Sequence, residues 1–349
     1  MSLVDHYPAI NRPTEPVCSI CIANYNGETL LRDCLESVLA QHGNIGFEII
    51  VHDDASSDDS VKLLRDKYPL VELLASRENV GFCVSNNRMA EQARGEFILL
   101  LNNDAALYPD ALETLLAVAR AQDRTGILTL PQYEWNSGQL LDRGCLIDPF
   151  YNPVPNLDPQ RSDVAIVIGA CLWIPRVLWI ELGGFPEWFD SIGEDLYLCC
   201  CARLAGHPVR VLNDSGYRHR VGASFGGGKT QGDKLVTTFN RRALSERNKT
   251  FVMAITLPSL VVQLWLPVHL LVLLFEGAML AILRGQRAYL SEIYLPVFRA
   301  LFENRRLLLK QRKAIMQQRS IKLRDFFSVF TLMPRKLSML FRHGLPQVK

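Results

Sequence analysis

Apolar and polar positions follow two different patterns over the first 125 residues. Short apolar runs at 17–23, 47–51, 71–75 and 97–101 are bounded by polar residues, which predicts buried strands of a parallel sheet. Between and after these runs, apolar residues recur at helical spacing over 28–40, 60–68, 83–94 and 109–121. Strands and helices that alternate with short connections predict an α/β fold, a doubly wound mixed sheet flanked by helices.

The pattern changes after Gly126. Residues 127–175 carry short apolar stretches among Pro, Gly and Trp residues, which we interpret as a second subdomain rather than as more of the sheet. Residues 256–283 then form a 28-residue run with one formal charge, Glu276, and a bilayer crossing needs roughly 20 apolar residues. The chain is therefore expected to contact a membrane.

Two prolines shape that expectation. Pro258 and Pro267 interrupt the apolar run, so a kinked or re-entrant helix competes with a straight span. We favour a re-entrant hairpin or a helix in the membrane plane over one complete crossing. A buried hydrophobic helix or a dimer face is the alternative, and the oligomeric state stays open.

Charge is distributed unevenly along the chain. Residues 284–349 hold fifteen Lys or Arg and three Asp or Glu, whereas the first 283 residues carry a net charge of −10. A basic tail predicts an anionic partner, and membrane lipids fit better than nucleic acid because interleaved aromatic residues and a nucleic-acid-binding motif are lacking. Nine cysteines and no apolar signal segment in residues 1–16 predict a reducing compartment and free thiols.

Carboxylates cluster where predicted strands end. Asp53 and Asp54 follow the run at 47–51, and Asn102-Asn103-Asp104 follows the run at 97–101. Ligands of open α/β sheets bind beyond the carboxyl ends of the strands, so two acidic ends predict a site for a metal ion and a diphosphate. A third cluster, Glu194-Asp195, precedes a predicted helix.

Five segments together resemble glycosyltransferase family 2, in order and separation, over about residues 17–250. They read SICIANYNG (19–27), HDDASSDDS (52–60), ENVGFCVSNNRMAEQARGEFILLLNNDA (78–105), GGFPEWFDSIGEDLYLCCCARLAGH (183–207) and YRHRVGAS (217–224). Within this family the chain is most similar to the bacterial rhamnosyltransferase-like branch. The resemblance implies a GT-A fold, an inverting mechanism and a divalent cation, Mg²⁺ or Mn²⁺.

The resemblance also implies residue roles. Asp195 is the expected catalytic base, with Glu194 as its neighbour or as a ligand of the acceptor. Asp104 and His219 are the expected metal ligands, with Ser224 on the same loop as His219 and Gly226 to Gly228 in a loop that closes over the donor. Asn102 stands where family members often carry an acidic residue, and its amide can still bind a ribose hydroxyl. The remaining residues expected to bind the nucleotide sugar are Asn24, Tyr25, Asn26, Asp53, Asp54, Asn79, Gly81, Asn87, Asn102, Asn103 and Arg247.

The expected protein is an inverting glycosyltransferase at the cytoplasmic face of the bacterial inner membrane. It would transfer a sugar, L-rhamnose foremost, from a dTDP- or UDP-sugar to a polyprenyl-diphosphate-linked glycan in cell-surface polysaccharide synthesis. The alternatives are a galactofuranosyl or hexosyl transferase of the same family and a catalytically silent membrane subunit that binds nucleotide sugar. We expect an N-terminal extension (1–16), a nucleotide-sugar-binding half (17–125), an acceptor-binding and catalytic half (126–250), and membrane-associated apolar and basic helices (251–349).

Overall fold

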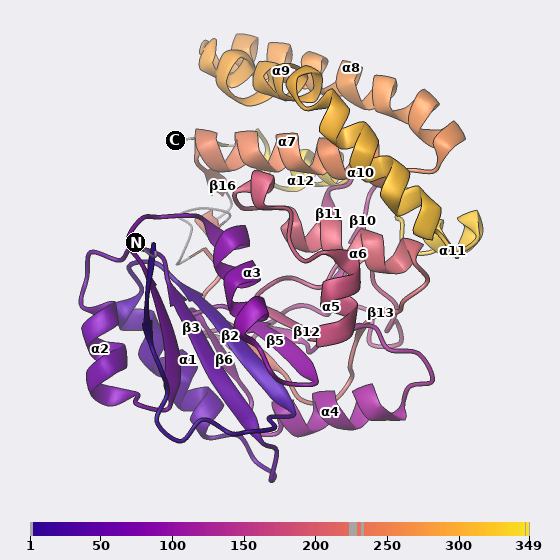
Figure 1. The fold of residues 1–349 in the computed structure, drawn as a ribbon. Coiled ribbons are helices and arrows are strands. Elements are labelled where there is room, and N and C mark those ends of the chain that lie inside the picture. Colours follow the sequence, from indigo (N-terminus) through magenta and orange to yellow (C-terminus); the bar gives the residue numbers. More distant parts are fainter. Residues whose placement is uncertain (1–2, 223–228, 232–233, 346, 349) are drawn as a thin grey trace.

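A mixed β-sheet forms the centre of the molecule (Figure 1). The computed structural model describes residues 3–222, 229–231, 234–345 and 347–348, and within them this sheet has eight strands. Strands β4, β3, β2 and β5 are parallel neighbours, and β12 runs antiparallel between β5 and β7. The strands, in spatial order, are β1 (Val4–Tyr7), β4 (Val71–Ser76), β3 (Phe47–Asp53), β2 (Cys18–Asn24), β5 (Phe97–Leu101), β12 (Cys171–Pro175), β7 (Ile127–Thr129) and β13 (Val209–Val211).

Helices cover both faces of this sheet. Alternate side chains of β2, β3 and β5 enter two hydrophobic cores, because successive residues of a strand point to opposite faces. One core receives α1 (Glu28–Leu39), α2 (Ser60–Lys67) and α4 (Ala111–Ala121). The other receives α3 (Phe82–Gln92), α5 (Arg176–Leu182) and α6 (Glu194–Leu204).

The strands and helices predicted for the first 125 residues are confirmed to within a few residues at each end. The interpretation of 127–175 as a separate subdomain is wrong in part, because β7 and β12 from this segment join the main sheet. The apolar residues of β12 run on into α5 with only Arg176 between them, so no polar boundary marks this segment as a strand.

The remaining strands of this region form small sheets beside the main one. A four-stranded sheet is ordered β6 (Ala105–Leu107), β14 (Tyr217–His219), β8 (Gln132–Glu134) and β9 (Leu140–Asp142). The other small sheets pair β10 (Cys145–Ile147) with β11 (Pro153–Pro155), and β15 (Lys229–Gln231) with β16 (Lys234–Thr237) and β17 (Gln347–Val348). A single 3₁₀ turn, Glu187–Phe189, lies between α5 and α6.

Helices make up the C-terminal third of the chain. Figure 1 shows α8 and α9 stacked over α7, on the side of α7 away from the main sheet. Buried residues of α7, α10 and α11 share one hydrophobic core with α6, so these helices are packed onto the sheet-bearing body. They are α7 (Phe239–Thr256), α8 (Ser259–Arg284), a π-helical turn (Tyr289–Tyr294), α9 (Leu295–Glu303), α10 (Arg305–Gln318), α11 (Leu323–Phe327) and α12 (Arg335–His343).

The apolar run forms one helix, not a hairpin. Helix α8 is continuous through Pro267, and the preceding break falls at Leu257 and Pro258. Within the described residues, α8 is the one helix long and apolar enough to cross a bilayer, and only 22% of its most apolar window is buried. The re-entrant hairpin is therefore excluded within this segment, and a mostly buried helix does not fit either.

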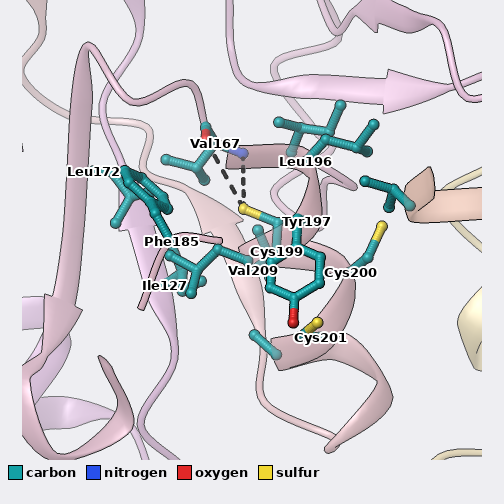
Figure 2. Close-up of a cluster of buried hydrophobic side chains, with 14 of the residues drawn as sticks. Ile127, Val167, Leu172, Phe185, Leu196, Tyr197, Cys199, Cys200, Cys201 and Val209 are labelled. Atoms are coloured by element: carbon teal, nitrogen blue, oxygen red, sulfur yellow. Dashed lines mark hydrogen bonds between the residues drawn. The ribbon is translucent and has the colours of Figure 1, made fainter. Parts of the chain in front are cut away.

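The nine cysteines all lie in the described part of the chain, are buried and carry free thiols, as predicted. Figure 2 shows Cys199, Cys200 and Cys201 on α6, among apolar side chains that include Leu196 and Phe185. The thiol of Cys199 lies 3.4 Å from the backbone nitrogen of Val167. These cysteines fill a core, where burial raises their thiol pKa values.

The N-terminal segment is part of the sheet. Strand β1 pairs with β4 in antiparallel register, which makes β1 the outer strand. Beyond it, Arg12 binds two buried carboxylates, Glu48 at 2.6 Å and Glu72 at 2.9 Å. Residues 4–12 therefore cover one edge of the sheet and neutralise charge beneath it.

Candidate active site

The carboxyl ends of β2, β3 and β5 meet at one edge of the main sheet. The Asn103 amide donates to Asn24 Oδ1 at 2.8 Å, and the Asn24 amide donates to Asp53 Oδ2 at 2.8 Å. The Ser56 hydroxyl donates to the same Asp53 oxygen at 2.7 Å. A Cβ on Gly27 would lie 2.2 Å from Asn103 Nδ2, so this close packing requires glycine. The structure thus brings these predicted residues together.

The turn after β2 leaves two of the predicted residues accessible. Tyr25 and Asn26 are both exposed. Asn26 has a φ of 49°, and its side-chain oxygen accepts the backbone N–H of Ser57 at 2.7 Å. This bond fixes the turn against the loop that follows β3.

Asp54 is tied to the loop before α3. Its two carboxylate oxygens accept the backbone N–H groups of Val80 and Gly81 at 2.7 and 2.9 Å, and the Asn79 amide reaches the Asp54 carbonyl at 3.4 Å. Gly81 has a φ of 87°, a conformation that favours glycine. Burial raises the pKa of Asp54. Asp54, Asn79 and Gly81 are therefore neighbours, as predicted.

Asn87 and Arg247 are engaged elsewhere. The Asn87 amide exchanges two hydrogen bonds with the backbone of Phe185, at 2.9 and 3.0 Å. Arg247 donates to the Phe189 carbonyl at 2.8 Å and pairs with Asp190 at 3.1 Å. Among the described residues, the walls of the main cavity do not include Asn87 or Arg247. Asn87 on α3 and Arg247 on α7 therefore bind the segment between α5 and α6.

A cavity of about 300 Å³ opens next to the strand ends. It gathers groups from distant parts of the chain: the end of β5, strands β8 and β14, the start of α6 and one face of α7. Its polar and charged lining includes Asn102, Asp104, Gln132, Ser191, Glu194, Asp195, His219, Arg241, Ser245 and Lys249.

Asp104 and His219 form one pair on this lining. His219 Nε2 lies 3.0 Å from Asp104 Oδ1, and both residues are buried. His219 Nδ1 lies 3.2 Å from Gln132 Oε1, an oxygen that also accepts the Tyr217 hydroxyl at 2.8 Å. Because an amide oxygen only accepts, Nδ1 carries the proton in this network. Nε2 is then directed at a carboxylate oxygen, an arrangement that calls for a proton or a metal ion between them.

A divalent cation fits this pair. Mg²⁺ binds ligands at about 2.1 Å in octahedral geometry, which separates adjacent ligand atoms by about 3 Å. The observed 3.0 Å between Asp104 Oδ1 and His219 Nε2 matches that separation. Over the described ranges, no group of three or more His, Cys, Asp or Glu side chains is placed to hold a metal ion. Further ligands would come from water or from a bound diphosphate.

Glu194 and Asp195 form a second pair on this lining, and both are acidic. They open α6 directly after Gly193, whose φ is 90°. Asp195 Oδ1 accepts the Leu196 backbone N–H at 2.7 Å, whereas Glu194 Oε2 is buried and has no hydrogen-bond partner among the described residues. Burial raises the pKa of both carboxyls, and the charge of Arg241 opposes that shift. A carboxylate with raised proton affinity is suited to remove a proton.

Asn248 holds the loop that presents this acidic pair. Its amide nitrogen lies 3.0, 2.9 and 2.7 Å from the carbonyl oxygens of Phe189, Ser191 and Ile192. Within this loop Asp190 and Ile192 have φ values of 64° and 67°, which residues other than glycine rarely adopt. Asn248 is fully buried, and its hydrogen bonds stabilise a backbone conformation that costs free energy.

Sequence reasoning missed the α7 wall of the cavity. Arg241, Ser245 and Lys249 recur every four residues, a spacing that indicates one helical face, but nothing in the sequence tells which element that face meets. Gln132 was missed as well, because its contact with His219 depends on the pairing of β8 with β14. Ser224 and Gly226 to Gly228 lie outside the described residues.

Part of the chain matches a known protein family and several curated proteins. Residues 19–176, from β2 to the end of β12, match the family model described as Glycosyl transferase family 2. The uncharacterized glycosyltransferase YibD of Escherichia coli K12 is 35% identical over 108 residues, 30% of this chain and 31% of the relative. Chondroitin synthase of Escherichia coli is 32% identical over 188 residues, 52% of this chain and 26% of the relative.

A solved structure shares the fold. GalNAc-T7, crystallised with UDP, GalNAc and Mn²⁺, superimposes with a TM-score of 0.54 at 18% identity, over 69% of this chain and 48% of that chain. The chain spans between about a quarter and about half of the length of the curated relatives that it matches. The family-model match over residues 19–176, the named relatives and the GT-A-like α/β fold support a glycosyltransferase.

Proposed function

We propose that the protein is an inverting glycosyltransferase that moves a sugar from a nucleotide-sugar donor to a glycan acceptor carried on a polyprenyl diphosphate. The observation that carries this proposal is the cavity, which Asp104 and His219 line together with Glu194 and Asp195. Inversion is a single displacement, so the leaving diphosphate and the attacking hydroxyl have to meet in one space. The cavity supplies the Asp104–His219 pair for the diphosphate and the acidic pair Glu194–Asp195 for the hydroxyl.

Asp195 acts as the general base in this proposal. The backbone N–H of Leu196 orients its carboxylate, and burial increases its affinity for a proton. The acceptor hydroxyl would bind against this carboxylate and lose its proton there as the sugar transfers. Glu194, which is buried beside Asp195, would bind the acceptor or change the proton affinity of Asp195.

The strand ends bind the donor in this proposal. A carboxylate has about four lone-pair sites, so the two backbone bonds to Asp54 leave capacity to accept the imide N–H of uracil or thymine. Asn24, Asp53 and the exposed Tyr25 lie at the same edge. Asp104 and His219 would hold Mg²⁺ or Mn²⁺, which shields the negative charge of the leaving diphosphate.

For the donor and the acceptor we propose L-rhamnose on a dTDP or UDP carrier and a lipid-linked glycan of a bacterial surface polysaccharide. The resemblance to the rhamnosyltransferase-like branch supports the sugar. The relative named chondroitin synthase supports polysaccharide synthesis, and the complex of GalNAc-T7 with UDP and Mn²⁺ supports a nucleotide carrier and a cation.

We propose further that α8 lies in the plane of the cytoplasmic face of the bacterial inner membrane. Leu264, Leu271 and Phe275 repeat at intervals of seven and four residues and are 75%, 67% and 70% exposed, so they form an apolar stripe on the outside of the molecule. The following residues 284–349 carry a net charge of +12, which attracts anionic headgroups. An interfacial helix keeps both of its ends, and the nucleotide-binding body, on the same side of the bilayer.

A donor screen tests the enzymatic proposal. Purified full-length protein with Mg²⁺ or Mn²⁺ is offered dTDP-L-rhamnose, UDP-galactofuranose and UDP-hexoses with a synthetic prenyl-diphosphate glycan, and products are identified by mass spectrometry and NMR. We expect rhamnose transfer with inversion, and Asp195→Asn should lower the rate by about 10²–10⁴ while UDP affinity stays within a few-fold. UDP binding without turnover of any donor would favour the silent subunit, and retention at the anomeric carbon would exclude the single displacement.

A further inference from the structure

Helix α7 presents different groups on two of its faces. Arg241, Ser245 and Lys249, spaced four residues apart, line the cavity. The adjacent positions Arg242 and Glu246 instead join a cluster of ion pairs with α8 and α12. The cavity therefore has a wall with two cationic residues in addition to the Asp104–His219 pair and the acidic pair Glu194–Asp195.

Two groups on this wall keep donor capacity. Within the described residues, the Arg241 guanidinium and the Ser245 hydroxyl make no hydrogen bond to another group, although the charge of Arg241 lies near those of Glu194 and Asp195. A guanidinium has five N–H donors and a hydroxyl has one. Both remain available to a ligand in the cavity.

Lys249 adds a third donor whose position is fixed. Its side chain is 5% exposed, it pairs with Glu246 and it donates to Asn152 Oδ1 at 2.7 Å. Two of its three N–H bonds are thereby used, which leaves one. Among the described residues, its ion cluster holds three cations and two carboxylates, a positive excess next to the cavity: Arg242, Lys249, Lys336, Glu246 and Glu276.

We propose that Arg241, Ser245 and Lys249 form a phosphate-binding subsite in the cavity. Phosphate oxygens accept strong, charge-assisted hydrogen bonds from Arg and Lys, and a serine hydroxyl adds a neutral one. The inference rests on the proposed function, because it assigns a position to one of the phosphates of that reaction. It also moves the phosphate contact from Arg247, which holds the backbone at 189–190, to the face of α7 that lines the cavity.

The phosphate has two sources, the donor diphosphate and the acceptor diphosphate. The acceptor is favoured for two reasons. Asp104 and His219 already provide a cation site for the donor, and α7 leads through Leu257 and Pro258 into the apolar helix α8. A lipid diphosphate that entered beside α8 would bring its charge to α7 and its chain to an apolar surface.

Calorimetric binding without turnover tests the subsite. The intact protein is titrated with inorganic pyrophosphate, with UDP, and with farnesyl diphosphate in the presence of saturating UDP. Arg241→Gln, Lys249→Gln and Ser245→Asp each change one group of the subsite, and Ser245→Asp leaves the ion cluster intact should Lys249→Gln fail to fold. Lys310→Gln, an exposed lysine on α10, is the matched control.

We expect the subsite variants to bind farnesyl diphosphate about tenfold or more weakly than wild type does. Their affinity for UDP should stay within twofold of wild type, and the control variant should bind both ligands as wild type does. A matching loss for UDP, together with competition between UDP and farnesyl diphosphate, would assign the subsite to the donor instead. The proposal is overturned if wild type binds neither pyrophosphate nor farnesyl diphosphate, or if folded variants bind both ligands and UDP as wild type does. Absence of sugar transfer with intact phosphate binding would contradict the proposed function alone.

Discussion

Replacing Asn248 with alanine removes the amide that holds the loop before α6. That amide serves three backbone carbonyls, those of Phe189, Ser191 and Ile192, at distances of 2.7 to 3.0 Å. The loop leads directly into Glu194 and Asp195. Stability and catalysis should therefore fall together.

The size of the effect follows from the number of donors. A side-chain amide has two N–H groups, so the three carbonyls share two hydrogen bonds. A buried group left without its partner costs about 1–3 kcal/mol, so the loss of two hydrogen bonds lowers the free energy of unfolding by about 2–6 kcal/mol. Release of the positive φ angles at Asp190 and Ile192 lets the loop relax, and a displacement of about 1 Å at the base costs about 10²-fold in rate.

Urea denaturation followed by tryptophan fluorescence measures the first effect, and kcat at low temperature, where the variant is folded, measures the second. Asn156→Ala is the matched control, since Asn156 is also buried and donates to two backbone carbonyls, those of Arg143 and Arg161. The control should lose comparable stability and keep its kcat per folded molecule. A stability loss below about 0.5 kcal/mol, or an unchanged kcat in Asn248→Ala, would refute the reasoning.

Three more predictions follow from other parts of the molecule. Asp104→Ala should weaken Mn²⁺-dependent UDP binding by about tenfold or more in calorimetry, as chelation should in wild type, and full affinity in a chelator would contradict the cation site. Burial lowers the pKa of His52 to about 4, so between about pH 4 and 6.5 this side chain binds a proton in the unfolded chain but not in the folded one, and it should contribute a loss of about 2 kcal/mol in stability from pH 7 to pH 5. Other buried titratable groups, His269 among them, also contribute, so His52→Gln should change the pH dependence in denaturant titrations by about 2 kcal/mol, and an unchanged pH slope would exclude the contribution of His52. Leu264→Asp with Phe275→Asp should lower binding to phosphatidylglycerol vesicles by at least about tenfold without changing the melting temperature, and undiminished sedimentation with vesicles would rule out the α8 stripe as the membrane contact.

The sequence predicted β2, β3, β4, β5 and the helices α1 to α4, but not β1 or β6, because the predicted elements have clear boundaries or a clear period. The segment forming β3 and that forming β5 are apolar runs closed by polar residues, and the helices between them show one apolar face. The same rule failed for β12, which is as buried as β5 but has no polar boundary before the apolar residues of α5. Local pattern reports how a residue is buried, not which neighbour buries it.

The site shows the same limit. Asp104 and His219 are 115 positions apart, and the family resemblance, not their spacing, suggested that they act together. For Arg247 the resemblance pointed to a phosphate, yet its partners are Phe189 and Asp190, 58 and 57 positions away. Arg241 was missed for the converse reason, since the side on which α7 meets the cavity is decided by the packing of α7 against α6 and α10.

The outer position of β1 has a consequence for how copies of the protein behave when crowded. Strand β4 consists of six buried residues, and without β1 its backbone N–H and C=O groups would face solvent as an open edge. Such an edge is a template on which strands of other molecules add, the first step of aggregation. Because Arg12 fastens the segment beyond β1 to Glu48 and Glu72, peeling β1 away would also remove the side chains that pair with the buried Glu72 and one of the two arginines that pair with Glu48. The N-terminal residues thus protect the protein from aggregation, because they cover the edge of the sheet to which strands of other copies would otherwise add.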